Sequence, residues 1–200
     1  MNEGVLFYWI MWMGWVFSTF LMKRNPFRSK LAFLFLFGII LSGHSISFPL
    51  GKINAAFILF LGIGFVYAVK NQDHLIHHLV SSFIVATAYV SLQLFALYDP
   101  VKLIVDKKYL LIIVLMMVLL IISKRNYDIL FIYFIGLFIG DSLFQLLIYR
   151  LQGYVDIGSD YVMDLLAITS FILIISLSSA EVLKKMRKAS YKKSSSAKQI

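Results

Sequence analysis

Asp141 is a carboxylate in a stretch that is otherwise almost entirely apolar. It lies in the run FIGDSLFQLL, and Gln145 follows four residues later, on the same face of a helix. An ionised carboxylate in hydrocarbon is costly unless it is paired or takes up a proton. We therefore expect Asp141, Ser142 and Gln145 to face other helices. Two interpretations stay open: a hydrogen-bonded residue that joins helices, or a proton relay, ion relay or substrate contact.

Three more polar residues lie within apolar runs. His44 is flanked by serines in SGHSISF, and Gln93 interrupts the run SLQLF. Asp164 falls about one turn inside the last apolar run, near its N-terminal end, so we expect it at the membrane interface. His44 is interpreted as a structural group, with proton relay as the alternative.

Two glycines precede Asp141 at a spacing of four residues. Gly136 and Gly140 form the sequence GLFIG. Small residues at this spacing allow two membrane helices to approach closely. We expect these glycines to form a helix-packing edge beside the polar residues.

The sequence HLIHHL places His74, His77 and His78 on one helical turn. Two imidazoles four residues apart can bind a transition metal. The pattern is not H-E-x-x-H, and no second group of metal ligands lies at a matching depth. We therefore predict no metal and no other cofactor, and an intramembrane metal hydrolase is the weaker alternative.

The composition indicates a membrane protein. Of 200 residues, 60% are apolar and 14% are charged, whereas soluble domains average about 25% charged residues. Cysteine is absent, which excludes disulfides and thiolate metal sites. Walker, dinucleotide-binding and nucleophile-elbow motifs are also absent, so we predict that the chain is not an enzyme.

The apolar runs predict an all-α fold, a transmembrane bundle of about seven helices. Each crossing requires a helix, because an isolated helix satisfies its own backbone hydrogen bonds in lipid. The expected helices are Gly4–Met22, Lys30–Phe48, Ile53–Val69, Leu75–Tyr98, Tyr109–Ser123, Tyr127–Tyr149 and Tyr161–Leu183.

The distribution of basic residues predicts the orientation. With seven crossings, fourteen of the nineteen Lys and Arg residues fall on the C-terminal side of the membrane and five on the other. The positive-inside rule then places the N-terminus outside and the C-terminus in the cytoplasm.

Residues 184–200 form a second region after the transmembrane domain, which covers residues 1–183. This tail is basic and serine-rich, so we predict that it is disordered and lies on anionic lipid headgroups. No nucleic-acid recognition pattern accompanies it. The expected lipid-binding residues are Lys184, Lys185, Arg187, Lys188, Lys192 and Lys193.

The opening sequence EGVLFYWIMWMGWVFSTFLMKRNPFR, the length and the basic C-terminus resemble the YphA-type membrane proteins of Bacillus-like bacteria. The resemblance implies the bacterial cytoplasmic membrane and assigns no functional residue.

Two functions remain open from the sequence. The first is a non-enzymatic membrane or envelope protein that acts through lipids, other membrane proteins or self-association. The second is a small secondary transporter with a polar path near Asp141, Gln145 and His44.

Overall fold

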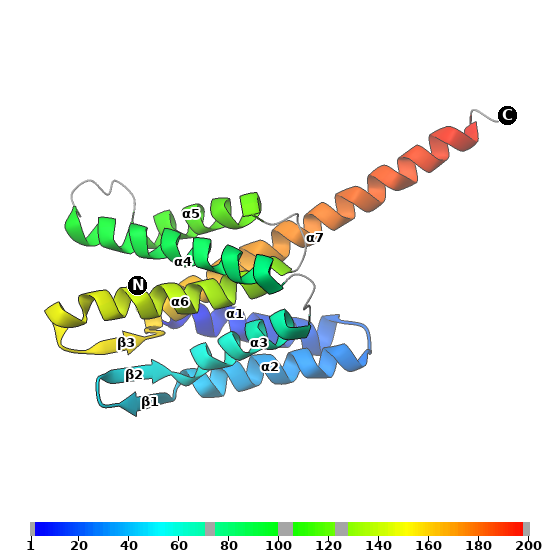
Figure 1. Ribbon diagram of the computed structural model, residues 1–200. Coiled ribbons are helices and arrows are strands. Elements are labelled where there is room, and N and C mark those ends of the chain that lie inside the picture. The colour runs from blue at the N-terminus through cyan, green and yellow to red at the C-terminus, as the bar shows by residue number, and fades with distance from the viewer. Residues whose placement is uncertain (1–2, 71–74, 100–105, 123–127, 198–200) are drawn as a thin grey trace.

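The computed structural model describes residues 3–70, 75–99, 106–122 and 128–197. These residues form seven α-helices, a short π-helix and one three-stranded sheet, arranged as a helical bundle with the sheet at one end (Figure 1). The helices are α1 (Val5–Val16), α2 (Pro26–Ser42), α3 (Ala55–Lys70), α4 (Leu75–Tyr98), α5 (Lys107–Ile122), α6 (Asp128–Gln152) and α7 (Asp160–Ala197). The π-helix η1 (Phe17–Leu21) extends α1.

Among the described residues, three helices are long and apolar enough to cross a membrane. They are α4, α6 and residues Asp160–Lys184 of α7, and the shorter apolar helices are Val5–Leu21 and α3. Each of the seven α-helices overlaps one of the predicted ranges, and α4 has the predicted bounds. The mainly helical fold expected from the apolar runs is therefore present.

The expectation of an entirely helical chain is wrong at one place. The second helix ends at Ser42, and β1 (Ser45–Phe48) and β2 (Gly51–Asn54) follow it as an antiparallel hairpin. β3 (Val155–Ile157) pairs in parallel with β2, with Gly51 opposite Val155. Strands that pair in parallel are joined by a long connection, so no local sequence pattern predicts the pairing of β2 with β3.

The C-terminal segment also differs from the prediction. Residues 184–197 continue α7 as a helix, where a disordered tail was expected. Lys, Arg, Ala and Met are good helix formers, and a preceding membrane helix removes the cost of nucleation. In Figure 1 this part of α7 projects away from the bundle.

The core lies where α6 contacts α3, α4 and α7. Leu137 and Tyr133 of α6, Tyr89 of α4 and Leu165 of α7 are fully buried there. Many large apolar side chains remain exposed on the outer faces of the helices, as expected of surfaces that meet lipid. Asp141 and Gln145 of α6 and Asp164 of α7 are buried inside this bundle.

Candidate functional site

Asp141 lies near the middle of α6 and binds the turn that follows β3. Its side chain is 1% exposed, and its Oδ2 atom accepts the backbone N–H of Gly158 at 2.8 Å. One turn further along α6, Gln145 Oε1 accepts the backbone N–H of Asp156 at 3.5 Å, a longer contact. Both side chains thus bind backbone groups along one edge of β3.

The spacing of helix and strand explains this arrangement. The other edge of β3 faces β2, since the N–H of Val155 donates to the carbonyl of Leu50 at 3.0 Å. N–H groups alternate in direction along a strand, so those of Asp156 and Gly158 point toward α6. Four residues of helix rise about 6 Å and two residues of strand about 6.6 Å. Asp141 and Gln145 therefore match the spacing of the two donors and close the edge of the sheet.

Two residues of α4 complete the cluster. The Tyr89 hydroxyl donates to Asp141 Oδ1 at 3.1 Å and accepts from Gln93 Nε2 at 2.8 Å. Tyr89 is 0% and Gln93 2% exposed. We call Tyr89, Gln93, Asp141 and Gln145 the α6 polar cluster. Sequence reasoning missed Tyr89, because an aromatic residue in an apolar helix resembles an ordinary core residue.

Two glycines allow the sheet to pack closely beside the α6 polar cluster. Gly158 has a φ of +71°, and a Cβ atom there would lie 2.7 Å from Phe57 Cβ. A Cβ on Gly51 would lie 1.9 Å from the carbonyl oxygen of Val155. Both positions require glycine, the first for its backbone conformation and its space and the second for close strand pairing.

Asp164 is buried in an ion pair at the end of the bundle where α1 and α5 begin. Its side chain is 1% exposed, and its Oδ2 atom lies 2.6 Å from Lys108 Nζ of α5. Its Oδ1 atom accepts the N–H of Phe7, in the first turn of α1, at 2.8 Å. Gly4, the N-cap residue of α1, provides no side-chain cap. Asp164 therefore caps α1 from another helix, where a negative charge also favours the helix dipole.

A second ion pair joins the strands at this end. Lys52 Nζ of β2 lies 3.2 Å from Asp156 Oδ2 of β3, and the two side chains are 42% and 33% exposed. The hydrogen bond to Asp156 and the charge of that carboxylate raise the pKa of Lys52 above its usual value, and burial opposes them weakly. Two lysines at the sheet end, Lys52 and Lys108, are thus bound to carboxylates.

Gly136 and Gly140 lie against α4. A Cβ on Gly136 would lie 2.8 Å from the carbonyl oxygen of Ser82, and one on Gly140 would lie 3.2 Å from Ala86 Cα. The small-residue edge thus packs within the chain and is occupied by α4. It places Asp141 within reach of Tyr89.

His44 and Ser142 do not join the cluster. His44 is exposed beyond the end of α2, where its Nδ1 atom lies 2.9 Å from the carbonyl oxygen of Ile40. Its predicted position inside the second helix is therefore wrong. The Ser142 hydroxyl has no hydrogen-bond partner within the described residues.

The predicted histidine cluster is only partly described. His78 is buried and His77 is exposed, and their ring centroids lie 5.9 Å apart. His74 falls outside the described residues. Within the described ranges, no three His, Cys, Asp or Glu side chains group as metal ligands.

The predicted lipid-binding residues lie on the last part of α7. Lys184 and Arg187 are exposed there. Lys185, Lys188, Lys192 and Lys193 belong to the same helix. The part of α7 that carries these residues projects from the bundle (Figure 1).

These features define a helical integral membrane protein with a sheet at one end of the bundle and a buried polar cluster that binds the chain's own backbone. A family model described as YphA-like integral membrane protein matches residues 3–200. The chain belongs to this family. It is 28% identical over 156 residues to the uncharacterized protein YphA of Bacillus subtilis (strain 168), covering 78% of each chain. No solved structure matches it.

Proposed function

We propose that the chain is a non-enzymatic, seven-pass protein of the bacterial cell membrane, with its N-terminus outside and its C-terminus in the cytoplasm. It acts as a scaffold that binds other envelope proteins. The observation that carries this proposal is the use of Asp141 and Gln145, which bind the backbone at Gly158 and Asp156. Hydrogen bonds of this kind support a structural role for the two side chains.

The charges at the two ends support the orientation. The end away from the sheet carries Lys23, Arg24 and Arg28 between η1 and the first turns of α2, Lys70 at the end of α3, and the basic part of α7. At the sheet end, Lys52 and Lys108 are paired with Asp156 and Asp164. Unpaired positive charge is thus concentrated at the end that the positive-inside rule assigns to the cytoplasm.

The free edge of β1 supports a scaffold. Within the described part of the chain, β1 pairs with β2 on one side only, and its residues Ser45, Ile46 and Ser47 are exposed. Ala55 N–H donates to the carbonyl of His44, so by alternation the backbone groups of Ser45 and Ser47 point away from β2. An exposed strand edge can accept an extended segment of another protein.

The test is complementation of a deletion strain, scored for growth and envelope stress at equal membrane levels. Ser47→Pro removes an outward N–H and leaves the β2 hydrogen bonds intact, and Ser47→Ala is the matched control. We expect Ser47→Ala to rescue and Ser47→Pro to fail. Equal rescue by both variants would exclude the β1 edge as the binding surface.

A small secondary transporter is the alternative. It is favoured by Gln93 Oε1, which is buried beside Tyr89 and has no hydrogen-bond partner among the described residues. An unpaired acceptor next to a carboxylate suits a proton or ion path. In this case Asp141→Asn, which cannot titrate, would abolish rescue although the protein reaches normal membrane levels.

A further inference from the structure

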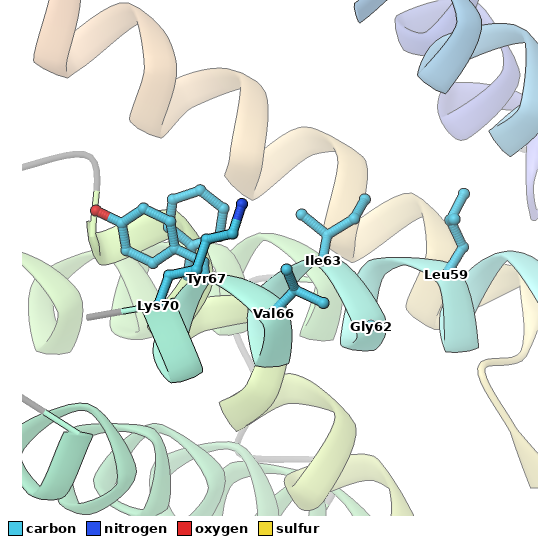
Figure 2. Close-up of a pocket in the computed structure, with 7 residues that line it drawn as sticks. Leu59, Gly62, Ile63, Val66, Tyr67 and Lys70 are labelled. Carbon is cyan, nitrogen blue, oxygen red and sulfur yellow. The ribbon is translucent and has the colours of Figure 1, made fainter. Parts of the chain in front are cut away.

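An apolar groove runs along the outer face of α3. It has a volume of about 480 Å³ and is lined by Leu59, Gly62, Ile63, Val66, Tyr67 and Lys70 of α3 and by Phe131 of α6. Figure 2 shows these α3 side chains along the groove, with the Lys70 ammonium directed back toward Ile63. Lys70 is the charged residue of this lining.

The groove has rigid walls. The rings of Tyr67 and Phe131 stack with centroids 3.7 Å apart and an angle of 11° between their planes. The Tyr67 hydroxyl donates to Asp128, which fixes the ring and engages that carboxylate. Gly62 leaves the middle open, because no atom lies within 4 Å of the position a Cβ would take.

The groove follows α3 from Leu59 to Lys70, over a helical rise of about 16 Å. Most of its lining side chains are apolar, and an apolar surface on the outside of a membrane bundle meets the hydrocarbon chains of lipids. An acyl chain lying along α3 is therefore the occupant that suits this lining.

The positive charge of Lys70 indicates which kind of lipid headgroup the groove can bind. Lys70 ends α3 at the end of the bundle away from the sheet, where the basic residues are concentrated. A lysine at the end of an apolar groove can pair with a phosphate at the bilayer surface while the groove holds the attached acyl chain. We propose that this groove binds one acyl chain of an anionic phospholipid, with the lipid phosphate at the Lys70 ammonium.

The test uses the full chain, purified in detergent and titrated with dioleoyl phosphatidylglycerol or dioleoyl phosphatidylcholine. Native mass spectrometry counts retained lipids, and thermal unfolding reports stabilisation. We expect one tightly retained phosphatidylglycerol, bound at least tenfold more tightly than phosphatidylcholine. Equal retention of the two lipids would overturn the assignment of an anionic ligand.

Variants locate the site. Lys70→Gln should abolish the preference for phosphatidylglycerol, whereas Lys23→Gln, at the same end but outside the groove, should preserve it. Gly62→Leu should fill the groove and abolish retention of either lipid, and Val66→Phe gives a second filling variant if Gly62→Leu misfolds. Equal effects of the two lysine variants, or retention by a folded filling variant, would contradict the proposal.

A soluble headgroup analogue distinguishes binding of a lipid from binding of a phosphate group alone. Glycerol 3-phosphate carries the phosphate without the acyl chain, so it should give no thermal stabilisation. The same stabilisation by glycerol 3-phosphate and by phosphatidylglycerol would mean that Lys70 binds an anion and that the groove does not bind lipid.

Discussion

Asp141 Oδ2 accepts the backbone N–H of Gly158 at 2.8 Å, which joins the interior of α6 to the turn between β3 and α7. The buried carboxylate thus provides an acceptor for a backbone N–H that would otherwise face α6 without a partner. Removing a buried acceptor costs about 1–3 kcal/mol for each donor left without a partner.

Asp141→Asn should therefore retain the fold, and Asp141→Leu should not. The Asn amide oxygen can accept from Gly158, and its NH₂ group can donate to the Tyr89 oxygen. Leu leaves the Gly158 N–H without an acceptor, so we expect a loss of about 1–3 kcal/mol. Thermal unfolding in detergent measures both variants. Equal losses would show that the charge of the carboxylate, and not its hydrogen bonds, stabilises this site.

Gly158→Ala should destabilise the protein more than Gly153→Ala. Both glycines have positive φ values, +71° and +68°. A Cβ at Gly158 would also clash with Phe57, whereas a Cβ at Gly153 meets nothing within 4 Å. Gly153→Ala therefore measures backbone strain alone, about 1 kcal/mol. The free energy of unfolding of the two variants separates strain from clash, and equal values would argue against tight packing on Phe57.

Lys108 and Asp164 should be strongly coupled. Lys108→Met leaves a buried carboxylate without its cation, which costs about 3–5 kcal/mol. Asp164→Asn removes the charge and retains an acceptor for the Phe7 N–H. We expect the double variant to be more stable than Lys108→Met, as measured by chemical or thermal unfolding. Additive losses in this double-mutant cycle would contradict a direct ion pair.

The Lys52–Asp156 pair should stabilise the protein at neutral pH and lose its effect in strong alkali. The folded state raises the pKa of Lys52 above 10.5, so its contribution is complete below that pH and disappears as the pH rises through the raised pKa. Solvent screening limits the effect to about 1 kcal/mol or less. The Tm difference between wild type and Lys52→Gln should shrink between pH 8 and pH 12. Lys52→Arg, which stays charged, should show no such decline.

Single cysteines can test the proposed orientation, because the chain contains none. Ser47→Cys lies on exposed β1, and Ser29→Cys and Arg187→Cys lie at exposed positions toward the other end of the bundle. An impermeant maleimide should label Ser47→Cys in intact cells and the other two only after permeabilisation. Labelling of Arg187→Cys in intact cells would reverse the orientation.

The helices were predictable because continuous apolar runs leave few alternatives. Leu75–Tyr98 is uninterrupted by charge, and the structure has the same bounds. The Gly136–Gly140 spacing likewise predicted close packing, although it could not name α4 as the partner. Local composition and spacing were sufficient for these features.

The sheet and the ion pair were not predictable from local patterns. Ser45–Phe48 alternates polar and apolar residues, but four such residues beside an apolar run cannot be distinguished from the end of a helix. Asp164 and Lys108 lie 56 residues apart, so neither indicates the other. Each of these features depends on contacts between segments far apart in the chain.

The pairing of Gly51 with Val155 sets an order of events during synthesis. About one hundred residues separate the two strands, so at about 5–20 residues per second β3 follows β2 out of the ribosome by roughly 5–20 s. During this interval the β1–β2 hairpin lacks its third strand, and Asp141 and Gln145 lack the backbone donors of Gly158 and Asp156. The late β3 segment and the start of α7 therefore complete the sheet and fix α6 in a single final step of assembly.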